Sequence, residues 1–152
     1  MRTRSMKVID MAVHDVATIT ADKTITECAT QMRAEHVGSL VIIDDAKTPI
    51  GMITDRDITI QVVARHLNPD TVTVGDVMTK PVVTAKINES MVVALARMRE
   101  FGIRRLPIVD EENKLVGVIS NSNLVEELSS LLEGLVRNIH SSKAREVALR
   151  SD

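Results

Sequence analysis

The sequence predicts an α/β fold built from two tandem copies of one strand–helix–strand–strand–helix unit. Two observations carry this prediction. A shift of 66 residues aligns the two halves without a gap and gives about eleven identities in about 52 positions, where chance gives three or four. Both halves also show helical and then strand-like apolar periodicity in the same order. Because one copy of about 60 residues has a marginal core, we expect the copies to pack on each other.

Each copy begins with a short extended stretch that leads into a helix. The expected strands span residues 16–20 and 82–86, and the apolar helical stripes are Ile25, Cys28, Ala29 and Met32, and Met91, Ala94, Leu95 and Met98. Thr24 and Glu27 have the spacing of a capping box, which predicts where the first helix begins. Ser90 is the equivalent cap in the second copy, although Val93 stands in place of the glutamate.

A hairpin and a second helix complete each copy. The expected hairpin strands are residues 40–43 and 50–53, and residues 106–109 and 115–119, each pair joined by polar turn residues. Thr54 and Asp55, or Ser120 and Asn121, can cap the helix that follows. The predicted division is a tail at 1–7, a first copy at 8–67, a linker at 68–75, a second copy at 76–133 and a helical tail at 134–152. Leucines recur from Leu124 onward and favour a packing or dimer helix, because the polar face mixes both charges.

Composition excludes several classes of function. The chain has one Phe, no Trp and no Tyr, and its net charge is −2, which disfavours nucleic-acid binding. The single Cys28 cannot form an internal disulfide, and its place on an apolar stripe predicts an inert core thiol. The four histidines show no metal spacing, so we expect no metal site. No run is apolar enough for a membrane span and no secretory signal is recognisable, so we expect a soluble, cytoplasmic protein with no membrane partner.

The end of each hairpin carries the sharpest chemical signal. Residues 51–57 and 117–123 share the pattern Gly, two apolar residues, Thr or Ser, two variable residues, and Asp or Asn. A hydroxyl at the start of a helix, with the free N–H groups of the first turn, forms a seat for an anion. Asp57 lies about one turn further on and can accept hydrogen bonds from two vicinal hydroxyls. A phosphate donor beside a diol acceptor suits a ribonucleotide.

These motifs, together with the repeat, resemble the CBS domain family, named after cystathionine beta-synthase. The resemblance covers residues 8 to 133 and rests on the segments 10–11 and 76–79, the run 102–110 and the two hairpin-end motifs. It implies two β-α-β-β-α units packed sheet to sheet with pseudo-two-fold symmetry, which leaves two clefts. In the family such clefts bind adenine-containing ligands, so we expect AMP, ADP, ATP or NAD as a ligand and no catalytic cofactor. It also implies a homodimer.

The resemblance further implies which residues bind the ligand. The first site would comprise Thr18, Ile19, Val37, Gly38, Ser39, Thr54, Arg56 and Asp57, and the second Thr84, Ala85, Ile103, Arg104, Arg105, Ser120 and Asn123. Asp57 matches the residue that holds the ribose hydroxyls and Thr54 the residue that touches phosphate, and Asn123 and Ser120 match them in the second copy. Because Asn lacks the charge that strengthens such hydrogen bonds, we expect the second site to be weaker. Residues 104–105 match phosphate-binding basic positions of related regulatory proteins.

Plainer interpretations compete for the same residues. Asp57 is also suited to be a first-turn acid that favours the helix dipole, and Thr54 and Ser120 to be simple caps. Residues 104–105 also read as an exposed charged pair, and Arg56 as a solvated helix residue.

No nucleophile–base pair, paired acid–base carboxylates or phosphate-binding glycine loop appears, and the repeats occupy almost the whole chain, so we expect no enzyme. The leading hypothesis is a stand-alone adenine-nucleotide sensor that relays occupancy of its cleft to an unidentified regulated protein. The alternative is a constitutive oligomerisation or interaction scaffold whose clefts are vestigial. Thermal melting with and without nucleotide separates the two hypotheses.

Overall fold

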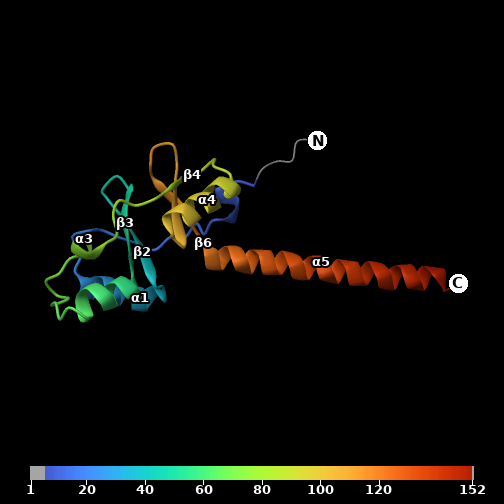
Figure 1. The fold of residues 1–152 in the computed structure, drawn as a ribbon, viewed down its shortest axis with the longest axis horizontal. Coiled ribbons are helices and arrows are strands. Elements are labelled where there is room, and N and C mark those ends of the chain that lie inside the picture. The colour runs from blue at the N-terminus through green and yellow to red at the C-terminus, as the bar shows by residue number, and fades with distance from the viewer. Residues whose placement is uncertain (1–5, 152) are drawn as a thin grey trace. The chain divides into compact units, whose positions relative to one another are not determined.

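The computed structural model describes residues 6–151, which form two compact units, one up to Ile119 and one from Ser120 onward. The first unit holds two three-stranded sheets, in the orders β1-β2-β3 and β4-β5-β6. The second unit is a single helix, α5 (Asn121–Arg150). Figure 1 shows the strands and shorter helices of the first unit and the long, unbroken α5. Two sheets with covering helices confirm the predicted mixed α/β fold.

The two copies repeat one order of elements. The first has η1 (Val8–Met11), β1 (Thr18–Ile19), α1 (Ile25–Glu35), β2 (Ser39–Ile43), β3 (Pro49–Thr54), α2 (Asp55–Ile58) and the π-helical turn η2 (Thr59–Val63), and the second has α3 (Val74–Val77), β4 (Ala85–Lys86), α4 (Met91–Phe101), β5 (Arg105–Val109) and β6 (Leu115–Ser120). β1 runs parallel to β2, and β2 runs antiparallel to β3. β4 likewise runs parallel to β5. The predicted strands and helices therefore all form, although β1 and β4 have two residues each.

The two main helices begin at the predicted caps. Thr24 Oγ1 accepts the Glu27 N–H, and the Glu27 carboxylate accepts the Thr24 N–H at 2.8 Å, which completes the capping box. Ser90 Oγ accepts the Val93 N–H at 3.3 Å, so α4 begins at its serine without the reciprocal glutamate. Both helices end on a left-handed residue, His36 in α1 and Gly102 in α4.

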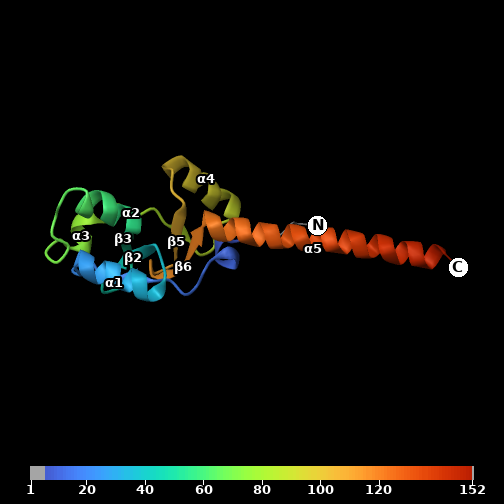
Figure 2. The ribbon, with the colours of Figure 1, turned by 90° about the horizontal axis from the view of Figure 1, so that it is seen from below.

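The segment that begins each copy packs on the other copy. The Val8 N–H donates to Glu89 O at 2.9 Å, and Val13 exchanges two backbone hydrogen bonds with Val118 in β6. The equivalent segment of the second copy packs on the first copy, where the Val74 N–H donates to Lys23 O at 2.8 Å. α3 accordingly lies beside α1, as Figures 1 and 2 show. The sequence predicts two contiguous copies, but the first residues of each copy hydrogen-bond to the other copy.

The regions that the sequence assigns to a linker and a tail are also structured. The expected linker at 68–75 ends inside α3, where the Asp76 carboxylate accepts the Thr73 N–H at 3.0 Å. That hydrogen bond is the main reason why the pKa of the Asp76 carboxyl lies below its usual range. α5 continues through Gly134 to Arg150, so no break marks the expected boundary at 133/134. Within residues 6–151 the helices lack the combination of length and apolarity that crossing a bilayer requires.

Cys28 lies in the core of the first copy. Its neighbours there include Ile25, Met32 and Ile42, and Cys28 itself has no exposed surface. Burial raises the pKa of the Cys28 thiol to about 11. At pH 8 only about one thiol in a thousand is then ionised, and the thiolate is the reactive form.

We therefore expect Cys28 in the folded protein to resist alkylation at pH 8. Iodoacetamide should react about 100-fold or more slowly with the folded protein than with the chain unfolded in guanidinium chloride, where the thiol pKa returns to about 8.5. Mass spectrometry of timed samples measures both rates. Equal rates would show that the thiol is accessible and ionisable in the folded state.

Candidate functional site

A cavity of about 550 Å³ joins the two copies within the first unit. Its lining comes from the end of β3 and from α2 in the first copy, from the segment before β4, and from the loop between α4 and β5. The lining residues are Met52, Thr54, Asp55, Arg56, Asp57, Thr79, Pro81, Val82, Val83, Gly102, Ile103, Arg104 and Arg105. This volume lies in the range that binds small organic ligands.

Thr54 and Asp57 form the first-copy wall of this cavity. The Thr54 hydroxyl accepts the Asp57 N–H at 3.1 Å, and Asp57 Oδ2 accepts the Thr54 N–H at 2.9 Å. The residues are therefore a capping box, as the plainer interpretation of the motif holds. Asp57 is half-buried and also lines the cavity, so its second oxygen and remaining lone pairs can accept further hydrogen bonds. Capping and ligand binding are compatible here, because the cap fixes the direction of the carboxylate.

The second-copy wall supplies positive charge. Arg104 is exposed, Arg105 is half-buried at the start of β5, and both line the cavity together with Ile103. A guanidinium suits phosphate because it is planar and can donate two parallel hydrogen bonds. With Arg56 from α2, three guanidinium groups share the cavity with the carboxylates of Asp55 and Asp57. The first-copy wall therefore offers acceptors for hydroxyls, and donors for phosphate come from Arg104 and Arg105 on the second-copy wall and from Arg56 on the first.

The cavity combines the predicted site residues in a different grouping from the one expected. The sequence places Thr54, Arg56 and Asp57 in one site and residues 103–105 in another, whereas the structure lines one cavity with both sets. The physical reason is the packing of the two copies, which brings the end of β3 opposite the loop before β5. Basic residues from the second copy and the acid of the first copy consequently face a common space.

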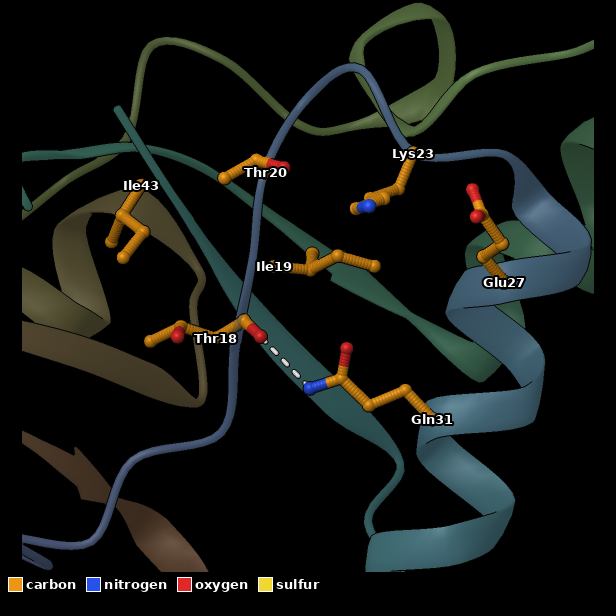
Figure 3. A pocket seen from close by; sticks show the side chains of 7 residues that line it. All are labelled: Thr18, Ile19, Thr20, Lys23, Glu27, Gln31 and Ile43. Atoms are coloured by element: carbon orange, nitrogen blue, oxygen red, sulfur yellow. Dashed lines mark hydrogen bonds between the residues drawn. The ribbon is translucent and has the colours of Figure 1, made fainter. Parts of the chain in front are cut away.

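Thr18 and Ile19 line a separate cavity of about 380 Å³, bordered by β1 and α1. Figure 3 shows Gln31 reaching from α1 to the backbone carbonyl of Thr18, a hydrogen bond of 2.8 Å. In the second copy, Arg97 Nη1 donates in the same way to the Thr84 carbonyl at 2.8 Å. Helix side chains at equivalent positions thus occupy both carbonyls. In each copy this hydrogen bond connects the first helix to the short strand before it, α1 to β1 and α4 to the residue before β4.

The remaining predicted site residues have structural roles in their own copies. Val37 packs against the first core, and Ser39 pairs with Thr54 across β2 and β3. Gly38 lies against Asp55, because a Cβ on Gly38 would come within 3.1 Å of Asp55 Oδ2. Among the described residues, the lining of the inter-copy cavity includes neither these three nor Thr84 and Ala85. Ala85 is buried in β4, and Ser120 accepts the Asn123 N–H at 3.2 Å as the cap of α5.

Several lining residues were not predicted from the sequence. They are Met52, Asp55, Thr79, Pro81, Val82, Val83 and Gly102. Thr79 exchanges two backbone hydrogen bonds with Met52, at 2.8 and 3.2 Å, and this bridge holds the segment before β4 against β3. The available signal was Gly51, since a glycine inside a strand indicates close approach of another backbone. Across residues 6–151, no three His, Cys, Asp or Glu side chains gather as metal ligands would.

Comparison with known proteins shows matches over most of the chain. The family model described as the CBS domain matches residues 8–63 and again residues 74–130. An uncharacterized protein of Methanopyrus kandleri is 40% identical over 123 residues, which is 81% of this chain and 63% of that protein. Inosine-5'-monophosphate dehydrogenase of Methanocaldococcus jannaschii is 33% identical over 120 residues, 79% of this chain but only 23% of the enzyme. The chain thus spans less than two thirds of either relative.

Solved structures show the same fold. The crystal structure of Hypoxic Response Protein I with two coordinated zinc ions matches with a TM-score of 0.71 at 30% identity, covering 80% of this chain and 98% of that one. The zinc ions belong to that protein.

Proposed function

The chain belongs to the CBS domain family, and we propose that it is a regulatory module that binds an adenine nucleotide in the cavity between its two copies. One observation carries this proposal: a cavity of about 550 Å³ is lined both by Asp57 of the first copy and by Arg104 and Arg105 of the second. A nucleotide has an apolar base, a ribose diol and a phosphate, and it needs a matching surface for each. The proposed ligands are AMP, ADP, ATP or NAD.

Each part of the nucleotide has a counterpart in the lining. Val82, Val83 and Ile103 provide aliphatic surface for the adenine faces. The Asp57 carboxylate accepts charge-assisted hydrogen bonds from the ribose hydroxyls. The two arginines donate to the phosphate, which lies toward the second copy. Because all three groups must be satisfied together, a ligand without the diol or without the phosphate binds more weakly.

The cavity also provides a means of relay. A bound nucleotide contacts both copies and the segment 79–83, which is hydrogen-bonded to β3 through Thr79 and Met52. A ligand shifts the packing of the copies only to the extent that it binds one arrangement better than another. A partner protein then reads that packing. The match to a part of inosine-5'-monophosphate dehydrogenase, 23% of its length, supports this role, because such a pair occurs there within a larger enzyme.

Thermal melting tests the proposal. Protein stripped of ligand by unfolding and refolding is melted alone and with AMP, ADP, ATP, NAD, NADH and S-adenosylmethionine. Ligand at about 100 times its Kd adds about 2.7 kcal/mol to the free energy of unfolding. For a chain of this size the melting temperature then rises by roughly 5–10 °C. No rise with any ligand, in protein shown to be folded and empty, would contradict the proposal and favour the scaffold alternative.

Replacing Arg104 and Arg105 together by alanine is expected to weaken nucleotide binding by about 10- to 100-fold. Each charge-assisted hydrogen bond contributes about 1.5–3 kcal/mol when it is desolvated, and less when the arginine is exposed. Adenosine, which has no phosphate, should lose little affinity. Isothermal titration calorimetry with both ligands measures the difference. Arg99→Ala is the matched control, since Arg99 is an exposed arginine of α4 outside the cavity lining. An equal loss for adenosine and nucleotide would show that the arginines do not contact phosphate.

A further inference from the structure

Helix α5 carries an apolar stripe that its own chain leaves in water. Seven large aliphatic side chains between residues 125 and 139 are each 48–62% exposed. They are Val125, Leu128, Leu131, Leu132, Leu135, Val136 and Ile139. Their spacing of three and four residues keeps them on one side of a helix with 3.6 residues per turn. The helix has 30 residues, so it is about 45 Å long and offers this stripe over several turns.

The two halves of α5 carry opposite charge. Residues 121–135 contain three glutamates and no basic residue. Residues 136–150 contain four basic residues and one glutamate, and that glutamate, Glu146, is 2.6 Å from Arg150 in the same helix. Arg137, Lys143 and Arg145 then match the three glutamates in number. A helix with an acidic first half and a basic second half is complementary to itself when one copy is reversed.

We propose that α5 pairs with α5 of a second copy of this chain in an antiparallel arrangement. The apolar stripe supplies the contact, and the charge segregation selects the direction. In an antiparallel pair the acidic half of each helix lies beside the basic half of the other, whereas a parallel pair sets like charges side by side. The helix dipoles also oppose each other. The resulting interface is isologous and closes as a two-fold dimer.

The sequence of the stripe is compatible with full overlap of the two helices. When the helix midpoints coincide, Leu132 lies opposite Ile139 of the second copy, and Leu135 lies opposite Val136. Leu128 lies opposite Lys143, whose methylene stem can cover the leucine while the amine remains in water. This inference concerns α5 alone and does not rest on the proposed nucleotide site.

Cysteine cross-linking in the full chain tests both pairing and direction. Leu128→Cys and Lys143→Cys are made as separate variants, with the buried Cys28 left in place. Under mild oxidation we expect a disulfide between copies when the two variants are mixed, and none with either variant alone. A mixture of Glu133→Cys with Lys143→Cys is the matched control, because 100° of rotation per residue places Glu133 away from the stripe.

The other outcomes overturn the proposal. Self-cross-linking of each variant alone would show a parallel pair. No cross-linking, with a monomer by sedimentation velocity at about 100 μM, would show that a different partner or a membrane surface covers the stripe. Leu131→Asp with Leu135→Asp provides a second readout: the double variant should lose the cross-link and the α5-dependent dimer while keeping its melting transition.

Discussion

Asp57→Ala is expected to abolish the thermal stabilisation that an adenine nucleotide confers. The carboxylate is the acceptor that lines the first-copy wall, and alanine leaves the two ribose hydroxyls without it. Hydrogen bonds to a charged group contribute about 1.5–3 kcal/mol each, so loss of both weakens binding by two to four orders of magnitude. A ligand concentration that raises the melting temperature by roughly 5–10 °C in the unaltered protein should then raise it by about 1 °C or less.

The same substitution also removes a helix cap, and this loss needs its own control. Asp57 Oδ2 accepts the Thr54 N–H at 2.9 Å, so the variant should be less stable by about 1 kcal/mol even without ligand. Asp76→Ala removes the equivalent capping contact to Thr73 in α3, at 3.0 Å, and Asp76 lies outside the cavity lining. It should melt lower but keep the full nucleotide response. If Asp57→Ala responds to nucleotide as Asp76→Ala does, Asp57 is only a cap.

Gly51→Ala is expected to destabilise the first unit by about 1–3 kcal/mol, as overpacking of a close contact does. A Cβ on Gly51 would lie 2.6 Å from Met78 Sδ and 3.0 Å from the Thr79 carbonyl. The segment that contains Met78 and Thr79 must then move away from β3, and the Met52–Thr79 bridge weakens with it. Because Thr79 also lines the cavity, we expect nucleotide affinity to fall as well.

Gly134→Ala is the matched control for that substitution. A Cβ at Gly134 meets no atom within 4 Å. In a helix interior, alanine is more stable than glycine by about 1 kcal/mol. Circular dichroism melts and calorimetric titrations of both variants should show Gly51→Ala less stable and Gly134→Ala unchanged or more stable. A Gly51→Ala variant as stable as the unaltered protein would show that the segment before β4 does not need this close approach.

The elements of the fold could be predicted because their signals are local. The capping box of Thr24 and Glu27 lies within four residues, and Ser90 caps its helix by the same short-range contact. The hairpins follow from apolar runs on either side of a polar turn. The motif around Thr54 and Asp57 also predicted a helix start, which the capping hydrogen bonds confirm.

The composition of the cavity could not be predicted because it depends on contacts between distant residues. Residues 104–105 follow Asp57 by nearly 50 positions, and no local pattern specifies that they share a cavity. The exchange of the first segments between copies is similarly remote, since Val8 bonds to Glu89. Thr18 lines a separate cavity, and the Gln31 side chain donates a hydrogen bond to its carbonyl there. Gly51 and Gly117, each inside a strand, were sequence signals of a close backbone approach between the copies.

The most direct measurement of the central claim is a crystal structure of the protein with AMP, or with the ligand that gives the largest rise in melting temperature. We expect density for the nucleotide in the inter-copy cavity, with its ribose at Asp57 and its phosphate at Arg104 and Arg105. An occupied site elsewhere, or an empty cavity at a ligand concentration that saturates the protein in solution, would contradict the proposed binding site.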